Sequence, residues 1–200
     1  MTKHIVFEGV WGCLLEKFTF EFIKRESFNF DAIKVGIGAS PFDGLRSWVF
    51  ALSENMHNWR DATGITLHQR CVWASYYYAK AIVDDDEISQ AEIKLFKDMT
   101  DSISELHELP DLIMYFHSIP KYAQKRLENE KSVCAEIGED NLKSVSKSLT
   151  EWLDAMTNKG VTVIEIPPVM IDDDEHFEKW YNFASSKLIK YLENMSDNQD

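Results

Sequence analysis

Five short apolar runs alternate with amphipathic stretches along the 200 residues, and this alternation constrains the fold more than any other feature of the chain. Each run is mostly apolar rather than alternately polar, as expected of parallel strands that are covered on both faces. The five predicted strands are His4–Glu8, Ala32–Ile37, Ile65–Gln69, Asp111–Phe116 and Val161–Ile166.

Helices are predicted in the stretches between and after these strands. They span Leu14–Arg25, Gly44–Arg60, Val72–Val83, Ser89–Glu108, Tyr122–Lys131, Glu139–Asn158 and Asp174–Asn194. The resulting order predicts an α/β fold with three layers, in which a five-stranded parallel sheet is covered by helices on both faces. Length predicts one domain over residues 1–195, followed by a disordered tail at 196–200.

The charge balance excludes one large class of partner. The chain carries 21 Lys and Arg against 34 Asp and Glu, a formal net charge of −13. A nucleic-acid partner would require a basic face that neutralises several phosphates, so we expect none. No apolar stretch approaches the roughly 18 residues of a membrane helix, so we expect no membrane partner.

The cysteines point to a cellular compartment and away from a metal site. Cys13, Cys71 and Cys134 are odd in number and far apart, which fits a reducing environment without a disulfide framework. No CxxC or HxxxH spacing suggests a metal site. With a first segment, Met1–Glu8, too short and polar for a signal peptide, we expect a cytoplasmic protein without a bound metal.

Ligands of open parallel sheets bind outside the carboxyl ends of the strands. The site is therefore expected in the loops Glu8–Cys13, Gly36–Pro41, Gln69–Cys71, His117–Pro120 and Ile166–Val169.

Several segments, taken in order, carry a family resemblance. They are IVFEGVWG (Ile5–Gly12), QRCVWASYYYAKA (Gln69–Ala81), LFKDMTDSISELHELPDLIMYFHSIPKYAQKRL (Leu95–Leu127), EDNLKSVSKSLTEWL (Glu139–Leu153) and DDEHFEKW (Asp173–Trp180). Together they resemble the deoxynucleoside kinase and thymidylate kinase family over nearly the whole chain. The resemblance implies a P-loop kinase-like fold and transfer of the γ-phosphate of ATP, with Mg²⁺, to a deoxynucleoside or deoxynucleotide.

The phosphate loop departs from the family pattern where its chemistry is concentrated. Such a loop ends in a lysine that contacts the phosphates and a hydroxyl that binds Mg²⁺. Glu8, Gly9 and Gly12 match the pattern, but the final glycine, the lysine and the hydroxyl are replaced by Leu14, Leu15 and Glu16. Lys17 lies two positions too late. Trp11 is expected either to fill the volume of the missing phosphates or to be an exposed anchor for a partner.

Two further positively charged or metal-organising parts are also altered. The acidic residue that the family places before the arginine of the third strand is Gln69 here, and Arg70 either binds an anion or pairs with a nearby acid. Arg126 matches the helix of the lid, the segment that closes over ATP in the family. The two arginines that clamp the phosphoryl group are replaced by Glu130 and Ser132, with Lys131 between them.

The nucleoside side is partly retained. No carboxylate in GIGASPF (Gly36–Phe42) matches the family's base for the substrate hydroxyl, and Asp43 is the nearest candidate. Trp48 and Phe50 match an aromatic part of the base pocket, while Ser53 replaces the glutamine that reads the base.

These losses predict a catalytically dead homologue, because losing one arginine finger already costs about 10³ in rate. The protein would act through protein–protein contact or retained nucleoside binding, without a cofactor. The alternative is a divergent active kinase that uses ATP and Mg²⁺ with Lys17 or Lys131. The expected ligand groove comprises Gly9, Gly12, Glu16, Trp48, Phe50, Gln69, Arg70 and Arg126. We also expect a homodimer that buries Val72–Val83 and Ser89–Glu108. An unknown protein partner is expected as well, as would suit a viral protein whose kinase gene was captured and repurposed.

Overall fold

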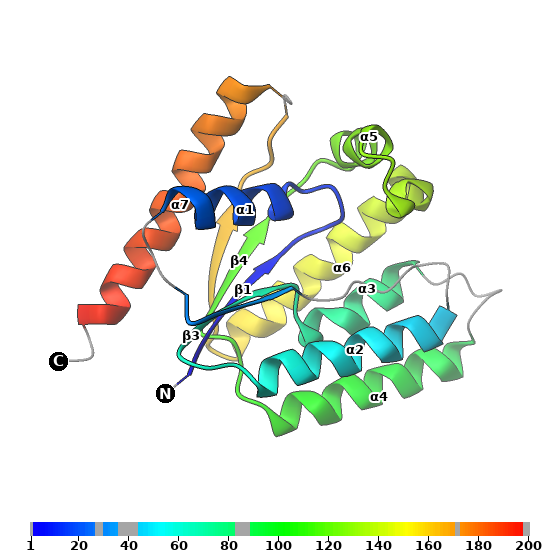
Figure 1. Ribbon diagram of the computed structural model, residues 1–200. Helices are drawn as coiled ribbons and strands as arrows, with labels where there is room; N and C mark the ends of the chain where they lie inside the picture. Colours follow the sequence, from blue (N-terminus) through cyan, green and yellow to red (C-terminus); the bar gives the residue numbers. More distant parts are fainter. Residues whose placement is uncertain (1, 27–29, 36–43, 83–88, 171–172, 198–200) are drawn as a thin grey trace.

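A parallel sheet of five strands forms the centre of the computed structural model, in the order β2-β3-β1-β4-β5 (Figure 1). The structure describes residues 2–26, 30–35, 44–82, 89–170 and 173–197. The strands are β1 (Lys3–Glu8), β2 (Ala32–Val35), β3 (Ile65–Gln69), β4 (Leu112–Phe116) and β5 (Thr162–Ile166). The predicted five-stranded α/β fold is therefore confirmed, although positions 36 and 37 of the predicted second strand lie outside the described residues.

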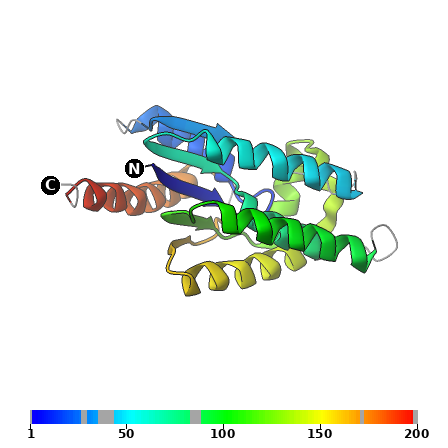
Figure 2. The ribbon, with the colours of Figure 1, turned by 90° about the horizontal axis from the view of Figure 1, so that it is seen from below.

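Helices cover both faces of the sheet, as the alternation along β1 shows. The Phe7 ring faces Phe18 of α1 at 5.5 Å between centroids, whereas the His4 ring stacks on Trp59 of α2 at 4.0 Å. Because neighbouring side chains of a strand point to opposite faces, α1 and α2 lie on opposite sides. Helix α7 lies beside α1, while α3 contacts α4 and α6 in the other layer (Figures 1 and 2).

The helices follow the predicted segments closely. Their bounds are α1 (Leu15–Arg25), α2 (Gly44–Arg60), α3 (Ser75–Ile82), α4 (Gln90–Leu106), α5 (Pro120–Asn129), α6 (Gly138–Asn158) and α7 (Asp174–Asp197), with the 3₁₀ turns η1 (Val72–Ala74) and η2 (Val133–Ile137). Ser89 caps α4 in a capping box with Glu92. No helix in the described part of the chain is long and apolar enough to cross a membrane.

Several predicted helix boundaries need correction. The segment predicted as one helix over 72–83 begins with η1 before α3, and position 83 lies outside the described residues. Helix α5 begins two residues early because Pro120 fits the first helical position, and it ends before Lys131, which has a left-handed φ of 52°. Helix α7 includes Ser196 and Asp197 of the predicted tail, while residues 198–200 lie outside the description.

Candidate functional site

The turn from β1 to α1 occupies the place of the expected phosphate loop, and two glycines fit it tightly against its neighbours. A Cβ on Gly9 would lie 2.6 Å from the carbonyl oxygen of Phe116 at the end of β4. A Cβ on Gly12 would lie 2.6 Å from the carbonyl oxygen of Ala123 in α5, and Gly12 also has a φ of 76°. The glycines are thus required by close contact with the protein itself.

Leu14 replaces the last glycine of the loop but has the left-handed backbone conformation that favours glycine. Leu14 has a φ of 68° and is the N-cap of α1, where its side chain makes no capping hydrogen bond. A left-handed conformation costs a side-chain-bearing residue about 1–2 kcal/mol. The next residue, Leu15, is completely buried, so the position of the family's lysine contributes to the core.

Glu8, at the end of β1, is the centre of a buried polar network. Its side chain is fully buried, and its carboxylate accepts hydrogen bonds from the Tyr78 hydroxyl at 2.8 Å and the Arg70 guanidinium at 3.1 Å. The backbone N–H groups of Gly9 and Cys71 donate to the same carboxylate. Burial raises the pKa of Glu8, while Arg70 and these hydrogen bonds oppose the rise.

Arg70 pairs with acids rather than remaining available to an anion. Its guanidinium also donates to the carbonyl oxygen of Gly9 and to the oxygen of Tyr78, and its second nitrogen lies 3.4 Å from the Glu16 carboxylate. Its side chain is 11% exposed, and its φ is 66°. Arg70 was expected either to bind an anion or to pair with a nearby acid, and in the structure it pairs with Glu8 and Glu16.

The two remaining cations near the loop are also engaged. The Lys17 ammonium lies over the Phe177 ring, 3.9 Å from its centroid. The buried Arg126 guanidinium donates to the carbonyl oxygens of Gly12 at 3.0 Å and of Val169 at 2.7 Å. Arg126 therefore joins α5 to the loop and to the segment between β5 and α7.

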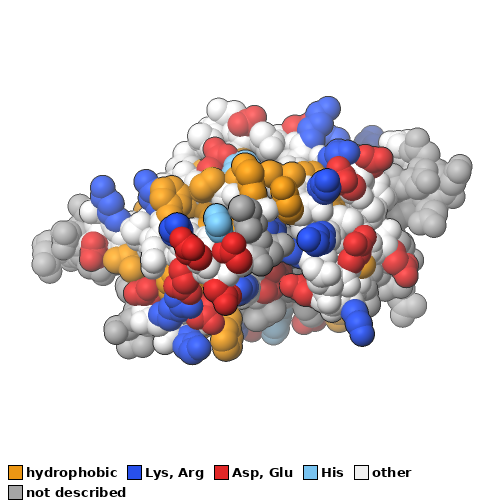
Figure 3. Space-filling model, turned by 90° about the horizontal axis from the view of Figure 1, so that it is seen from above, with side chains coloured by type: hydrophobic (Ala, Val, Ile, Leu, Met, Phe, Trp, Pro, Cys, Tyr) orange, Lys and Arg blue, Asp and Glu red, His pale blue; other side chains and the backbone are white. Residues whose placement is uncertain are grey.

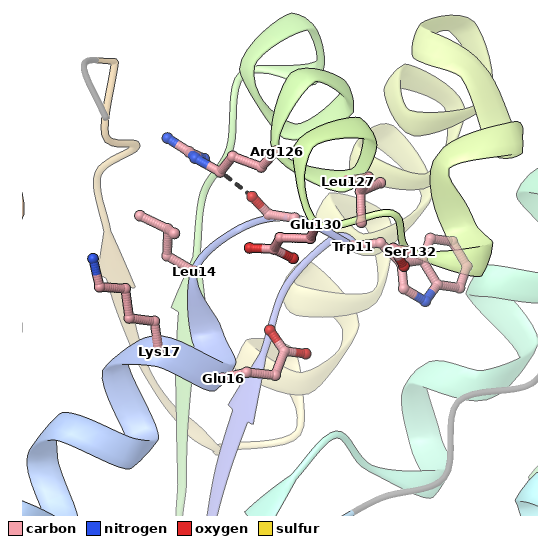
Figure 4. A pocket seen from close by; sticks show the side chains of 9 residues that line it. Trp11, Leu14, Glu16, Lys17, Arg126, Leu127, Glu130 and Ser132 are labelled. Carbon is pink, nitrogen blue, oxygen red and sulfur yellow. Dashed lines mark hydrogen bonds between the residues drawn. The ribbon is translucent and has the colours of Figure 1, made fainter. Parts of the chain in front are cut away.

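A cavity of about 180 Å³ remains between the loop, the start of α1 and the end of α5. Figure 4 shows Glu16 and Glu130 projecting into it from opposite sides, while Lys17 lies beyond Leu14. Trp11 lines one side; it is 8% exposed and its ring packs against Tyr78 at 4.8 Å. Trp11 is therefore a buried wall of the cavity and neither fills it nor forms an exposed anchor.

The residues of this cavity do not fit the phosphates of ATP. Glu16 places a carboxylate where the Mg²⁺-binding hydroxyl belongs, and Glu130 adds a second negative charge. Arg70 is tied to Glu8 and Glu16, and Lys17 lies over an aromatic ring.

The nucleoside side is described only in part. Gly36–Asp43 lies outside the described residues, as does the side chain of Trp48 on α2. Phe50 on the same helix is 58% exposed and is not among the residues that line the cavity beside the loop. Gln69 is half-buried at the end of β3, opposite Phe7 of β1.

The structure thus brings together part of the expected ligand groove. Gly12, Glu16 and Arg126 line one cavity, and Arg70 bonds Gly9 beside it, whereas Phe50 lies elsewhere on α2. Sequence reasoning missed Tyr78, which lies eight residues after Arg70 among three consecutive tyrosines. Three consecutive residues of a helix point in different directions, so the sequence does not reveal which of the three tyrosines is buried. Only the packing of α3 identifies Tyr78 as the buried one.

Comparison with known proteins agrees with this fold. The deoxyadenosine kinase from M. mycoides with bound dATP superposes with a TM-score of 0.70 at 15% identity, covering 90% of this chain and 97% of the other. The same enzyme with the products dCMP and a flexible dCDP gives 0.73 at 12% identity, covering 96% and 99%. No curated protein sequence matches. The deoxynucleoside kinase family model matches residues 46–190, and the chain therefore belongs to the deoxynucleoside kinase family.

Proposed function

We propose that this protein is a catalytically inactive member of the family that acts by binding. The observation that carries this proposal is the pairing of Glu16 with Arg70 at the end of the phosphate loop. Glu16, which replaces the Mg²⁺ ligand, thus neutralises Arg70. In the described part of the chain, Arg70 is the only cation that follows the third strand next to the loop. Phosphoryl transfer relies on positioning and on neutralising charge, so this exchange removes the means of catalysis.

The alternative, an active kinase that uses Lys17 or Lys131, has weaker support. The Lys17 side chain lines the cavity, but its ammonium lies on the Phe177 ring. Lys131 is exposed and follows the end of α5 with a left-handed backbone. Either lysine would need a rearranged loop, whereas Gly12 and Ala123 hold the present loop in close contact.

The test is thermal unfolding with ATP, deoxynucleosides and deoxynucleotides, each with and without Mg²⁺. A ligand at about 100 times its Kd adds about 2.7 kcal/mol, which for a chain of this size raises Tm by about 5–10 °C. We expect no Mg²⁺-dependent rise with ATP and no phosphoryl transfer. A rise that is lost in Lys17→Ala or Lys131→Ala would overturn the proposal.

A nucleoside arm of the same experiment separates two modes of binding. A rise with a deoxynucleoside alone, independent of Mg²⁺, would assign the protein a nucleoside pocket. Phe50→Ala is the matched variant, because the side chain is exposed and its loss should leave the fold intact. The absence of any rise would leave a protein partner as the binding mode to test, starting with a pull-down.

We also propose a homodimer in the cytoplasm. Leu95 and Leu106 on α4 are 56% and 77% exposed, which favours burial of this helix by a second copy. The three cysteines are free thiols, as expected in a reducing compartment. Sedimentation equilibrium tests the dimer, and Leu95→Glu together with Leu106→Glu should give monomers.

A further inference from the structure

We propose that the buried pair of His4 and His68 is an acid-operated latch, which holds the end of α2 on the sheet and releases it when the pair takes up two protons. Both rings lie on the face of the sheet that α2 covers. Figure 2 shows this helix from below, whereas Figure 3 shows the molecule from above, with charged side chains of both signs around a hydrophobic patch. The altered phosphate loop takes no part in the contact, so the inference holds for an inactive and an active kinase alike.

Two neighbouring strands place the two rings against one another. In the parallel ladder of β1 and β3, His4 lies opposite Thr66, and His68 lies opposite Val6. Side chains two positions apart on a strand share a face, so the two histidines are diagonal neighbours on one side of the sheet. His4 Nδ1 lies 3.0 Å from His68 Nε2, and both residues are buried. The geometry is that of a hydrogen bond between two imidazole rings.

This contact limits how many protons the pair can hold. An imidazole nitrogen either carries an N–H or offers a lone pair, so one nitrogen of the contact must donate to the other. The first added proton goes to an outer nitrogen and leaves the hydrogen bond in place. The second added proton directs two N–H groups at one another across 3.0 Å and puts a positive charge on each ring. The doubly protonated pair must therefore separate.

The surroundings of the pair oppose its second proton more than its first. Burial lowers the pKa of both histidines, that of His68 to about 3, because a charge is taken out of water. Asp111 opposes this fall at His4, whose backbone N–H it also accepts at 2.8 Å, whereas a charged His4 deepens it at His68. The charged and titratable groups of neighbouring elements that act on the pair are Lys34 of β2, His107 and Glu108 after α4, and Asp111 before β4, with Lys3 of β1 paired to Asp111.

Trp59 links the pair to α2. Its ring stacks on His4 with 4.0 Å and on His68 with 4.4 Å between centroids, and the residue is only 4% exposed. Trp59 is the last residue but one of α2, so the stack attaches this end of the helix to β1 and β3. Separation of the two histidines breaks the stack. Because α2 also carries the exposed Phe50, acid loosens the helix of the nucleoside side and leaves the phosphate loop as it is.

The experiment measures hydrogen–deuterium exchange of the full-length protein by ¹H–¹⁵N spectra at several pH values between 7 and 4, each with and without a low concentration of urea. Each rate is divided by that of the unfolded chain at the same pH, which gives an equilibrium constant for opening. Amide groups of residues 56–60 report the end of α2, and those of β4 report the core. Urea separates local from global opening, because only an opening that exposes much surface responds to it.

We expect the opening constant of residues 56–60 to rise about a hundredfold from pH 7 to pH 4 with little response to urea, whereas β4 should open only in a way that depends on urea. His68→Gln keeps a group that hydrogen-bonds to His4 but does not titrate, and should reduce the rise to less than about tenfold. The matched control is His57→Gln, an exposed histidine on the same helix, which should keep the full rise.

Three results would overturn the inference. The first is an opening of residues 56–60 that depends on urea as strongly as that of β4, since the pair would then contribute only to global stability. The second is an opening constant that does not change with pH. Both are measured on the unaltered protein, so they decide the question even where His68→Gln fails to fold. The third is an equal reduction of the rise in His57→Gln and His68→Gln.

Discussion

Replacing Arg70 by methionine tests whether the buried network at the end of β1 is electrostatic. The substitution keeps much of the apolar stem but removes the guanidinium from Glu8, which is fully buried. Removing one partner of a buried pair costs about 3–5 kcal/mol, because the other charge stays buried. Three hydrogen bonds to Glu8, from Tyr78, Gly9 and Cys71, remain, so we expect the low end of that range, about 3 kcal/mol at pH 7.

The pH dependence gives this prediction a signature that simple loss of packing lacks. Burial raises the pKa of Glu8 above its ordinary value of 4.5, and Arg70 opposes that rise. In Arg70→Met the pKa rises further, so the native state binds a proton that the unfolded chain has released above about pH 4.5. The cost of the substitution should therefore grow as pH rises above the pKa that Glu8 has in the wild-type protein, by up to about 1.4 kcal/mol per pH unit.

The assay is urea unfolding of Arg70→Met at pH 5, 6 and 7, followed by tryptophan fluorescence. Adding Glu8→Gln removes the orphaned charge and should restore part of the lost stability and abolish the pH dependence. Glu16→Gln is the matched control, since that carboxylate pairs with the same guanidinium but is 61% exposed, and should cost less than about 1 kcal/mol. A cost for Arg70→Met below about 1 kcal/mol at every pH would refute the reasoning.

Three further predictions concern the backbone and the opposite end of the sheet. Gly12→Ala should cost about 2–4 kcal/mol in thermal unfolding because its Cβ would meet Ala123, whereas Gly160→Ala, with a φ of 87° and open space, should cost about 1 kcal/mol; similar costs would contradict this account. Leu14→Gly should raise stability by up to about 1 kcal/mol in urea by relieving the left-handed φ, and a loss would mean that the Leu14 side chain contributes more than the strain. Burial and the neighbouring His4 lower the pKa of His68 to about 3, so the stability present above pH 6.5 should be lost as pH falls, by up to a few kcal/mol at pH 4. His68→Gln should flatten this dependence of stability on pH, whereas substitution of the exposed His57 in the control His57→Gln should not. An unchanged pH dependence in His68→Gln would contradict the assignment.

Much of the fold could be predicted because its signals are local. An apolar run such as Ile65–Gln69 has the length and composition of a covered parallel strand, and the structure has the same bounds. Helix α2 likewise follows the predicted span Gly44–Arg60. The small differences arise at helix ends, where Pro120 starts α5 early and Ser132 opens η2, a turn that the helix pattern does not contain.

The candidate site could be predicted only as a set of losses. The replacement of lysine and hydroxyl by Leu15 and Glu16 is visible in the sequence, and so is the survival of Arg70. What Arg70 does is decided elsewhere, because its partners Glu8 and Glu16 are 62 and 54 residues away and meet it only at the edge of the sheet.

The sequence by itself determined the layers of this protein and the replacement of the lysine and the hydroxyl of its phosphate loop, because periodicity and residue type are properties of short segments. Only the tertiary structure decided that Arg126 donates to Gly12 and Val169, that Lys17 lies on Phe177, and that Glu16 and Glu130 share a cavity. The physical reason is that a charged side chain finds its partner by proximity in space. That proximity is set here by parallel strands whose carboxyl ends meet at one edge while their residues lie far apart in the chain.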